Sequence, residues 1–260
     1  MSFDAQRSWD LVRLQVAAGQ RPAGSPQLRK LAEKLVKMLP DGRFEPIPGD
    51  PGLRNIVGRL PGTKPAIVIG AHYDTLTKPK GFVGANNGAA GSAIVIEVAR
   101  ALEAAAPAPG REIQFVLFDG EEPPAGLPGG GTEFYSEGLR GSRAYVEAHA
   151  GDSAAMILLD YVGHRGLLLP REGSSTTSLW EQLLGAARSA GASRFFSAEA
   201  GPVIIDDHTP FLRAGVPAVD LIDWRYPGHS RADGLEKISL ASLDGVGETV
   251  ARLALELRAG

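Results

Sequence analysis

Acidic side chains and histidines follow four short apolar runs of this sequence. They are His72, Asp74, Asp119, Glu121, Glu122, Asp160, Asp220, Asp223 and His229. Ligand sites in open α/β sheets form beyond the carboxyl ends of the strands, so we expect these side chains to meet in one crevice. Unpaired carboxylates that close would repel each other, and a bound dication is the simplest relief. Histidine and carboxylate donors without cysteine suit zinc.

The acids also have an interpretation that needs no metal. Acidic residues after strands are common as helix N-caps and turn residues, and for a single acid this explanation is about as good. The complete set, with each member at a strand end, favours the metal site. His72 is followed by Asp74, a carboxylate that can orient a ligand imidazole. His149 and His164 have no such partner, and we interpret them as surface or packing residues.

The apolar runs themselves predict the fold. They are short, nearly continuous and rich in β-branched residues, as in strands buried on both faces. The runs are 66–71, 113–118, 154–160 and 218–223. Helical patterns lie between them, and two further helices are predicted within residues 4–39. This alternation predicts one α/β domain over residues 1–260, with a mixed, mostly parallel sheet between helices on both faces. The Pro/Gly-rich segment 123–140 is predicted to be an insertion loop.

Composition restricts the possible partners and locations. The chain has 260 residues with 27 basic and 30 acidic side chains, so no basic stripe suggests nucleic acid. The absence of cysteine excludes disulfides and thiolate metal sites. No apolar run approaches the length of a membrane span, and the N-terminus lacks the pattern of a signal peptide. We therefore expect a cytoplasmic protein with no membrane or nucleic-acid partner.

Seven sequence blocks, in order, carry a resemblance to a known family. They are GAHYDT (70–75), FVGANNGAAG (82–91), FVLFDGEE (115–122), RGSRAY (140–145), MILLDYVG (156–163), IIDDHTPFLRAGVPAVDLID (204–223) and HSRAD (229–233). Together they resemble the co-catalytic zinc aminopeptidases and their relatives, the glutaminyl-peptide cyclotransferases. The resemblance covers nearly the whole chain and implies a zinc-exopeptidase-like fold, a largely parallel sheet flanked by helices.

The resemblance also implies a set of metal ligands. His72 and Asp160 match the ligands of one zinc, and Glu122 and His229 match ligands of the other. The position of Asn87 corresponds to an aspartate that bridges two metals in the aminopeptidases and binds the single metal in the cyclases. Asn87 is therefore a candidate ligand through one neutral carbonyl oxygen.

Other residues match positions that act on the substrate. Glu121 matches the general base that takes a proton from metal-bound water, or shuttles it in the cyclases. Asp207 matches a cyclase aspartate of the substrate pocket, and Asp74 matches the carboxylate behind the histidine ligand. Further candidates for the substrate pocket are Asp206, His208 and Trp224.

Asn87 is the main departure from the family pattern. Two dications about 3.5–4 Å apart repel by roughly 15–20 kcal/mol at an effective dielectric near 20. A neutral amide offsets less of this than a bridging carboxylate, so the sequence favours one zinc over two. Four explanations stay open: a one-metal site, a degenerate homologue that binds peptides, a deliberate inactivating change, or deamidation of Asn87 next to Gly88.

Two reactions fit these residues. The first prediction is a zinc-dependent aminopeptidase that hydrolyses N-terminal peptide bonds with metal-activated water and Glu121 as base. The alternative is a glutaminyl-peptide cyclotransferase that forms N-terminal pyroglutamate with one zinc. The long loop after Glu122 and the DDHTPF block favour the cyclase, whereas Gly228 stands where cyclases have a tryptophan. A metal-poor peptide-binding homologue is the third possibility, and in each case the partner is a peptide or aminoacyl compound with a free N-terminus.

Overall fold

A twisted sheet of six strands forms the centre of the computed structural model, which describes residues 2–105, 110–124 and 131–260. The strand order is β1-β2-β4-β3-β5-β8. These strands are β1 (Arg43–Pro46), β2 (Arg54–Leu60), β3 (Thr63–His72), β4 (Arg111–Phe118), β5 (Ser153–Asp160) and β8 (Ala218–Ile222). The four strands predicted from the apolar runs are parallel neighbours, β4-β3-β5-β8. The predicted mixed, mostly parallel sheet is therefore confirmed.

Two antiparallel strands on one side of the sheet were not predicted. β1 pairs with β2, and β2 pairs with β4, both antiparallel. Both are at least partly polar: β1 reads RFEP and β2 reads RNIVGRL. β1 lies at the edge of the sheet, where proline and charge are tolerated. β2 is paired on both sides, but its charged ends interrupt the apolar pattern.

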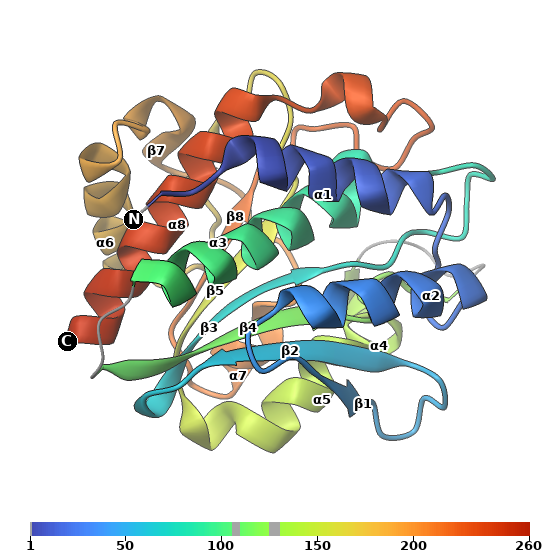
Figure 1. The fold of residues 1–260 in the computed structure, drawn as a ribbon, viewed down its shortest axis with the longest axis horizontal. Coiled ribbons are helices and arrows are strands. Elements are labelled where there is room, and N and C mark those ends of the chain that lie inside the picture. Colours follow the sequence, from blue (N-terminus) through green and yellow to red (C-terminus); the bar gives the residue numbers. More distant parts are fainter. Residues whose placement is uncertain (1, 106–109, 125–130) are drawn as a thin grey trace.

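Helices cover both faces of the sheet (Figure 1). They are α1 (Ala5–Ala17), α2 (Pro26–Leu35), α3 (Gly91–Ala105), α4 (Gly131–Glu137), α5 (Arg140–His149), α6 (Thr177–Ser189), α7 (Thr209–Arg213) and α8 (Leu240–Ala259). Helices α1, α2, α3, α6 and α8 contribute to the large core on one face, and α5 and α7 to the smaller core on the other. Side chains of β3 alternate between them: Ile67 and Ile69 belong to the large core and Val68 to the smaller one.

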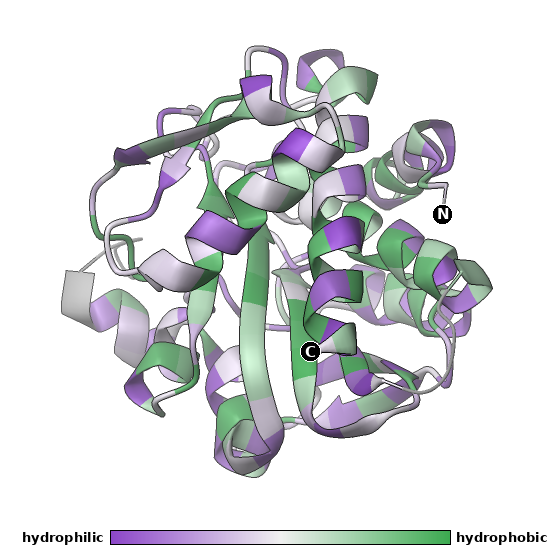
Figure 2. Ribbon diagram, turned by 90° about the vertical axis from the view of Figure 1, so that its left-hand side faces the viewer, coloured by the Kyte–Doolittle hydropathy of each residue, from purple (hydrophilic) through white to green (hydrophobic). Residues whose placement is uncertain are grey.

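The central strands are apolar along their length, whereas the helices are polar on their outer sides (Figure 2). This pattern is typical of a parallel sheet buried on both faces. Helix α2 begins at Pro26, and Ser25 before it accepts a hydrogen bond from the Leu28 N–H.

The remaining elements are small. A second sheet pairs β6 (Leu169–Arg171) with β7 (Phe196–Ala200). Single turns occupy η1 (Val36–Met38), η2 (Ala85–Ala90), η3 (Ala150–Asp152), η4 (Ser193–Phe195) and η5 (Leu235–Lys237). The predicted insertion loop 123–140 is not wholly irregular, because it contains α4, and its residues 125–130 lie outside the described residues. Among the described helices, none is both long and apolar enough to cross a membrane.

Candidate active site

Three strand ends bring the predicted acids and a histidine together. Strand β3 ends at His72, β5 ends at Asp160, and the residues after β4 include Glu121 and Glu122. Gly70 pairs with Leu158, which sets Asp160 level with His72 on the neighbouring strand. The His72 Nε2 atom lies 3.5 Å from Asp160 Oδ1. The parallel register thus brings together His72 and Asp160, the first of two pairs of predicted metal ligands.

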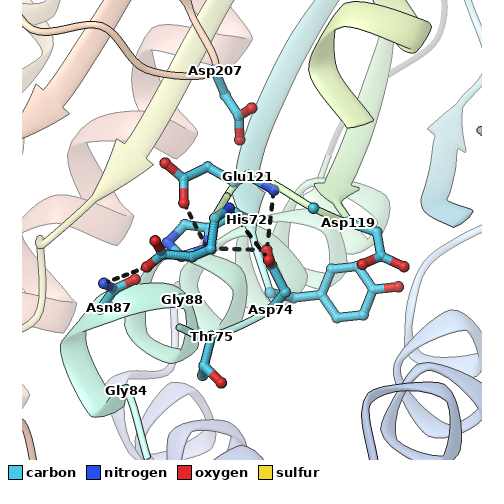
Figure 3. Close-up of polar contacts among 12 residues, drawn as sticks. His72, Asp74, Thr75, Gly84, Asn87, Gly88, Asp119, Glu121 and Asp207 are labelled. Atoms are coloured by element: carbon cyan, nitrogen blue, oxygen red, sulfur yellow. Dashed lines mark hydrogen bonds and ion pairs between the residues drawn. The ribbon is translucent and has the colours of Figure 1, made fainter. Parts of the chain in front are cut away.

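The Asp74 carboxylate connects His72 to the turn after β4. Its side chain is fully buried, and Oδ1 lies 3.4 Å from His72 Nδ1. The same carboxylate accepts hydrogen bonds from the N–H groups of Glu121 and Glu122, each at 3.3 Å (Figure 3). One carboxylate therefore orients the imidazole and fixes the turn that carries both glutamates.

Asn87 lies in the turn that leads into α3. Asn87 and Gly88 leave helical geometry within η2, and Gly88 has a φ of +87°. A Cβ at Gly88 would lie 2.6 Å from the Asp74 carbonyl oxygen and 3.2 Å from the His72 ring. Only glycine therefore lets this backbone pass so close to the imidazole.

The Asn87 carboxamide occupies the space between the donor groups. Its Nδ2 atom donates to Glu122 Oε1 at 3.0 Å and to the Tyr161 hydroxyl at 3.3 Å. Its backbone N–H donates to Asp233 Oδ2 at 3.0 Å. His229 completes a second donor pair, with Nε2 3.9 Å from Glu122 Oε1 and 47% of its side chain exposed.

A cavity of about 750 Å³ opens over these groups. It is lined by Asn87, Glu121, Glu122, Phe134, Asp160, Tyr161, Val203, Ile204, Ile205, Asp206, Ile222, Trp224, Tyr226, Pro227, Gly228, His229 and Ser230. Four of these side chains are carboxylic acids and, among the described lining residues, none is Lys or Arg. The wall is otherwise mostly apolar. Such a pocket suits a ligand with an amino group at one end and an apolar body.

Four predicted pocket residues take different places. Asp206 and Trp224 line the cavity, and Trp224 is 47% exposed, so it is not a core residue. Asp207 is fully buried, and its carboxylate points toward Glu121 (Figure 3). His208 does not line the cavity. It is fully buried just before α7, with Nε2 3.2 Å from Glu172 Oε2.

Three predicted acids, Asp119, Asp220 and Asp223, do not join the donor groups. Asp119 accepts a hydrogen bond from the Arg54 N–H at 3.1 Å. Asp220, in β8, lies beneath His208, with Oδ2 3.6 Å from His208 Nδ1. Asp223 pairs with Arg225 at 2.8 Å and with His164 at 3.3 Å. The expectation that these three acids meet the other carboxylates is wrong, because none of them lines the cavity.

Burial controls the protonation of this acid-rich site. Burial, together with the neighbouring Glu122, raises the pKa of Glu121 well above its usual range. Burial likewise raises the pKa of Glu122 to about 8 and that of Asp206 to about 7. Burial alone would lower the pKa of His72, but Glu121, Asp160 and Asp74 outweigh it and raise that pKa. A cation entering the cavity would be stabilised by the same groups.

The donor atoms test whether zinc fits. Asn87 Oδ1, Glu122 Oε2 and His72 Nε2 are buried with no hydrogen-bond partner. Nitrogen and oxygen donors of this kind suit zinc. Among the described residues, however, no group of three or more histidine and acidic side chains surrounds one point. Glu122 and His229 supply two neighbouring donors, and the buried Asn87 carbonyl oxygen is a candidate for a third.

Comparison with known proteins identifies the family. The sequence profile of Peptidase family M28 matches residues 55–254. The chain belongs to peptidase family M28. It is 28% identical to bovine (Bos taurus) glutaminyl-peptide cyclotransferase over 238 residues, which are 78% of this chain and 65% of that protein. The chain thus spans slightly less than two thirds of this curated relative.

Solved structures of two activities resemble this M28 chain. A glutaminyl cyclase from an Acidobacteriales bacterium has a TM-score of 0.83 and 28% identity, covering 99% of this chain and 96% of that one. A leucine aminopeptidase precursor from Bacteroides thetaiotaomicron has a TM-score of 0.83 and 25% identity, covering 98% of each chain. The expected zinc-exopeptidase-like fold is confirmed, and the family supports an enzyme. The comparisons leave hydrolysis and cyclisation open.

Sequence reasoning missed three residues of the site. Tyr161 follows Asp160 directly, and its hydroxyl contacts Asn87. Asp233 lies in the HSRAD block and holds the Asn86 and Asn87 N–H groups. Arg21 is fully buried, in the segment before α2. Asp233 was visible within a family block, but nothing in the sequence marks Arg21 as buried.

Proposed function

We propose that this chain binds the free N-terminus of peptides in the cavity and cyclises an N-terminal glutamine, releasing ammonia. The observation that carries this proposal is the carboxamide of Asn87 between Glu122 and Tyr161. A neutral amide there weakens the case for two bound metals, which hydrolysis by a two-metal site would need. The likeness to cyclases from animals and bacteria supports the same choice.

One zinc ion is part of this proposal. Glu122, His229 and the Asn87 carbonyl oxygen would hold it, because Glu122 Oε2 and Asn87 Oδ1 are buried without partners. When bound, such an ion polarises the carbonyl of the glutamine side chain. His72 and Asp160 would then stay behind the reacting atoms, with His72 Nε2 3.5 Å from Asp160 Oδ1.

The proton moves through Glu121 in this scheme. The substrate α-amine nitrogen attacks the side-chain amide carbon, the new carbon–nitrogen bond closes the ring, and the old one breaks to release ammonia. Glu121 takes the proton from the attacking amine and returns it to the leaving nitrogen. Burial raises the pKa of Glu121, which makes its carboxylate a stronger base than that of an exposed glutamate. Asp207, buried above Glu121, contributes through its charge to the raised pKa of Glu121.

Aminopeptidase activity is the second candidate. Gly228 lines the cavity where cyclases have a tryptophan, so the loop before His229 lacks that side chain. The cavity wall is otherwise mostly apolar, which suits apolar N-terminal side chains. The structural likeness to a leucine aminopeptidase precursor supports this alternative.

Paired assays test the proposal. With added zinc, we expect the chain to release ammonia from an N-terminal glutaminyl peptide and to leave an aminoacyl chromogenic substrate intact. Glu121→Gln should lower turnover by about 100-fold or more while zinc content stays the same. Turnover of the chromogenic substrate alone would replace cyclisation by hydrolysis. Unchanged turnover in Glu121→Gln would remove Glu121 from the mechanism.

A further inference from the structure

Tyr161 is held in an unusual backbone conformation at the cavity. It has a φ of +50°, one of three non-glycine residues with positive φ among the described residues. Its N–H donates to Asp160 Oδ1 at 2.8 Å, which fixes this turn at the end of β5. A left-handed conformation is costly for a tyrosine, and such conformations cluster at functional sites. The turn places the ring in the cavity wall beside Glu122 and Asn87.

Gly228 makes room for this ring. A Cβ at position 228 would lie 2.6 Å from ring carbons of Tyr161 and 2.7 Å from its hydroxyl oxygen. Any larger residue at 228, including the tryptophan of the cyclases, would displace the tyrosine. The Tyr161 ring therefore depends on a glycine at position 228. In this chain the aromatic ring of the cavity comes from the residue after β5, whereas in the cyclases it comes from the residue before the last histidine.

The hydrogen of the Tyr161 hydroxyl makes no hydrogen bond to the described residues. It accepts a hydrogen bond from Asn87 Nδ2 at 3.3 Å, and among the described residues this amide is its only hydrogen-bond partner. A phenolic hydroxyl both accepts and donates, so its own hydrogen remains available to a ligand in the cavity. Glu122 and His229 lie on the same side, with the His229 ring centroid 6.2 Å from that of Tyr161.

We propose that the Tyr161 hydroxyl donates a hydrogen bond to the substrate carbonyl oxygen that gains negative charge during attack, which makes Tyr161 a catalytic residue. This rests on the proposed action at a carbonyl carbon. As the nucleophile bonds to that carbon, the carbonyl π electrons move to oxygen, and they return when the leaving nitrogen departs. A fixed donor aimed at this oxygen stabilises the intermediate charge. In cyclisation the oxygen belongs to the glutamine side chain, and in hydrolysis to the peptide bond.

The test removes the hydroxyl and keeps the ring. Tyr161→Phe should lower kcat/KM by about 100-fold on whichever substrate the wild type turns over. Tyr145→Phe is the matched control, because that hydroxyl bonds Gln114 in the core on the other side of the sheet. Gly228→Ala should reproduce the loss by displacing the ring, and it should add little in the Tyr161→Phe background.

Binding separates this proposal from the proposed reaction. In a Glu121→Gln background, calorimetry compares a glutaminyl dipeptide, a norvalyl dipeptide and norvalinol, which has no carbonyl. Tyr161→Phe should weaken only the glutaminyl ligand. Weakening of both dipeptides would keep the donor role but assign it to the peptide carbonyl, against cyclisation. Two outcomes would overturn the role of Tyr161. In the first, Tyr161→Phe changes neither the affinity for any of the three ligands nor kcat/KM. In the second, it weakens the binding of norvalinol as well.

Discussion

The side chains of Asn86 and Asn87, in the turn before α3, point to different places. Asn87 faces the cavity and contacts Glu122. Asn86 turns away from it: its Oδ1 accepts from the Gly163 N–H at 2.7 Å, and its Nδ2 lies 3.2 Å from His164 Nδ1. Only Asn87 can therefore change the charge presented to an ion in the cavity.

A negative charge should therefore change zinc affinity at position 87 and not at position 86. Asn87→Asp should raise zinc affinity by at least about 10-fold, because a carboxylate attracts the dication more strongly than an amide oxygen. Competition with a chelator measures the affinity, and elemental analysis measures zinc per chain, which should rise. Asn86→Asp is the control with the same charge change and should leave zinc affinity unaltered. Equal affinities for the wild type and Asn87→Asp would remove position 87 from the metal site.

At the scale of elements, Arg21 joins the two loops that carry the site. Its guanidinium donates to the carbonyl oxygens of Tyr73, Val83 and Gly84. Tyr73 follows His72 at the end of β3, and Gly84 precedes η2. Burial lowers the Arg21 pKa to about 10, opposed by the charges of Asp74 and Asp233. The segment before α2 thus fixes the spacing of His72 and Asn87.

We predict that Arg21→Lys destabilises the fold by about 3 kcal/mol. A lysine keeps the charge but cannot reach three carbonyl groups in a planar fork. Denaturant unfolding measures the change, and Arg13→Lys is the control because the Arg13 side chain is 62% exposed. A loss no larger than that of Arg13→Lys would show that the three carbonyl contacts contribute little.

The sequence predicted elements better than the connections between them. The four buried strands and the N-terminal helices follow from apolar patterns, and strand ends correctly placed His72, Asp160 and Glu122 in one region. The pattern did not distinguish the cavity side of β8 from the side facing α7, so Asp220 was misplaced. Contacts made by loops distant in sequence, such as those of Arg21, have no local signature.

At the scale of the whole molecule, buried acids link stability to pH. Asp119 is 2% exposed, and burial, with the nearby Asp74, raises its pKa from 3.8 to about 7. Its Oδ1 atom has no hydrogen-bond partner among the described residues. The folded protein keeps a proton that the unfolded chain loses near pH 4. Stability from this group therefore falls as the pH rises from about 4 to about 7.

Asp119→Asn should reverse this loss. Its free energy of unfolding should match the wild type near pH 4 and exceed it by roughly 4 kcal/mol above pH 7. Denaturant melts at several pH values measure the difference, with Asp10→Asn as an exposed control. A difference that is constant across pH would show that Asp119 titrates normally.

The proposed reaction cyclises an N-terminal glutamine in the cavity and leaves the peptide chain uncut. Mass spectrometry of a glutaminyl peptide after incubation with the zinc-supplemented protein tests it most directly. We predict a product that has lost one ammonia and kept every residue. Release of free glutamine with a shortened peptide, or a peptide that stays unchanged beyond its spontaneous rate, would contradict it.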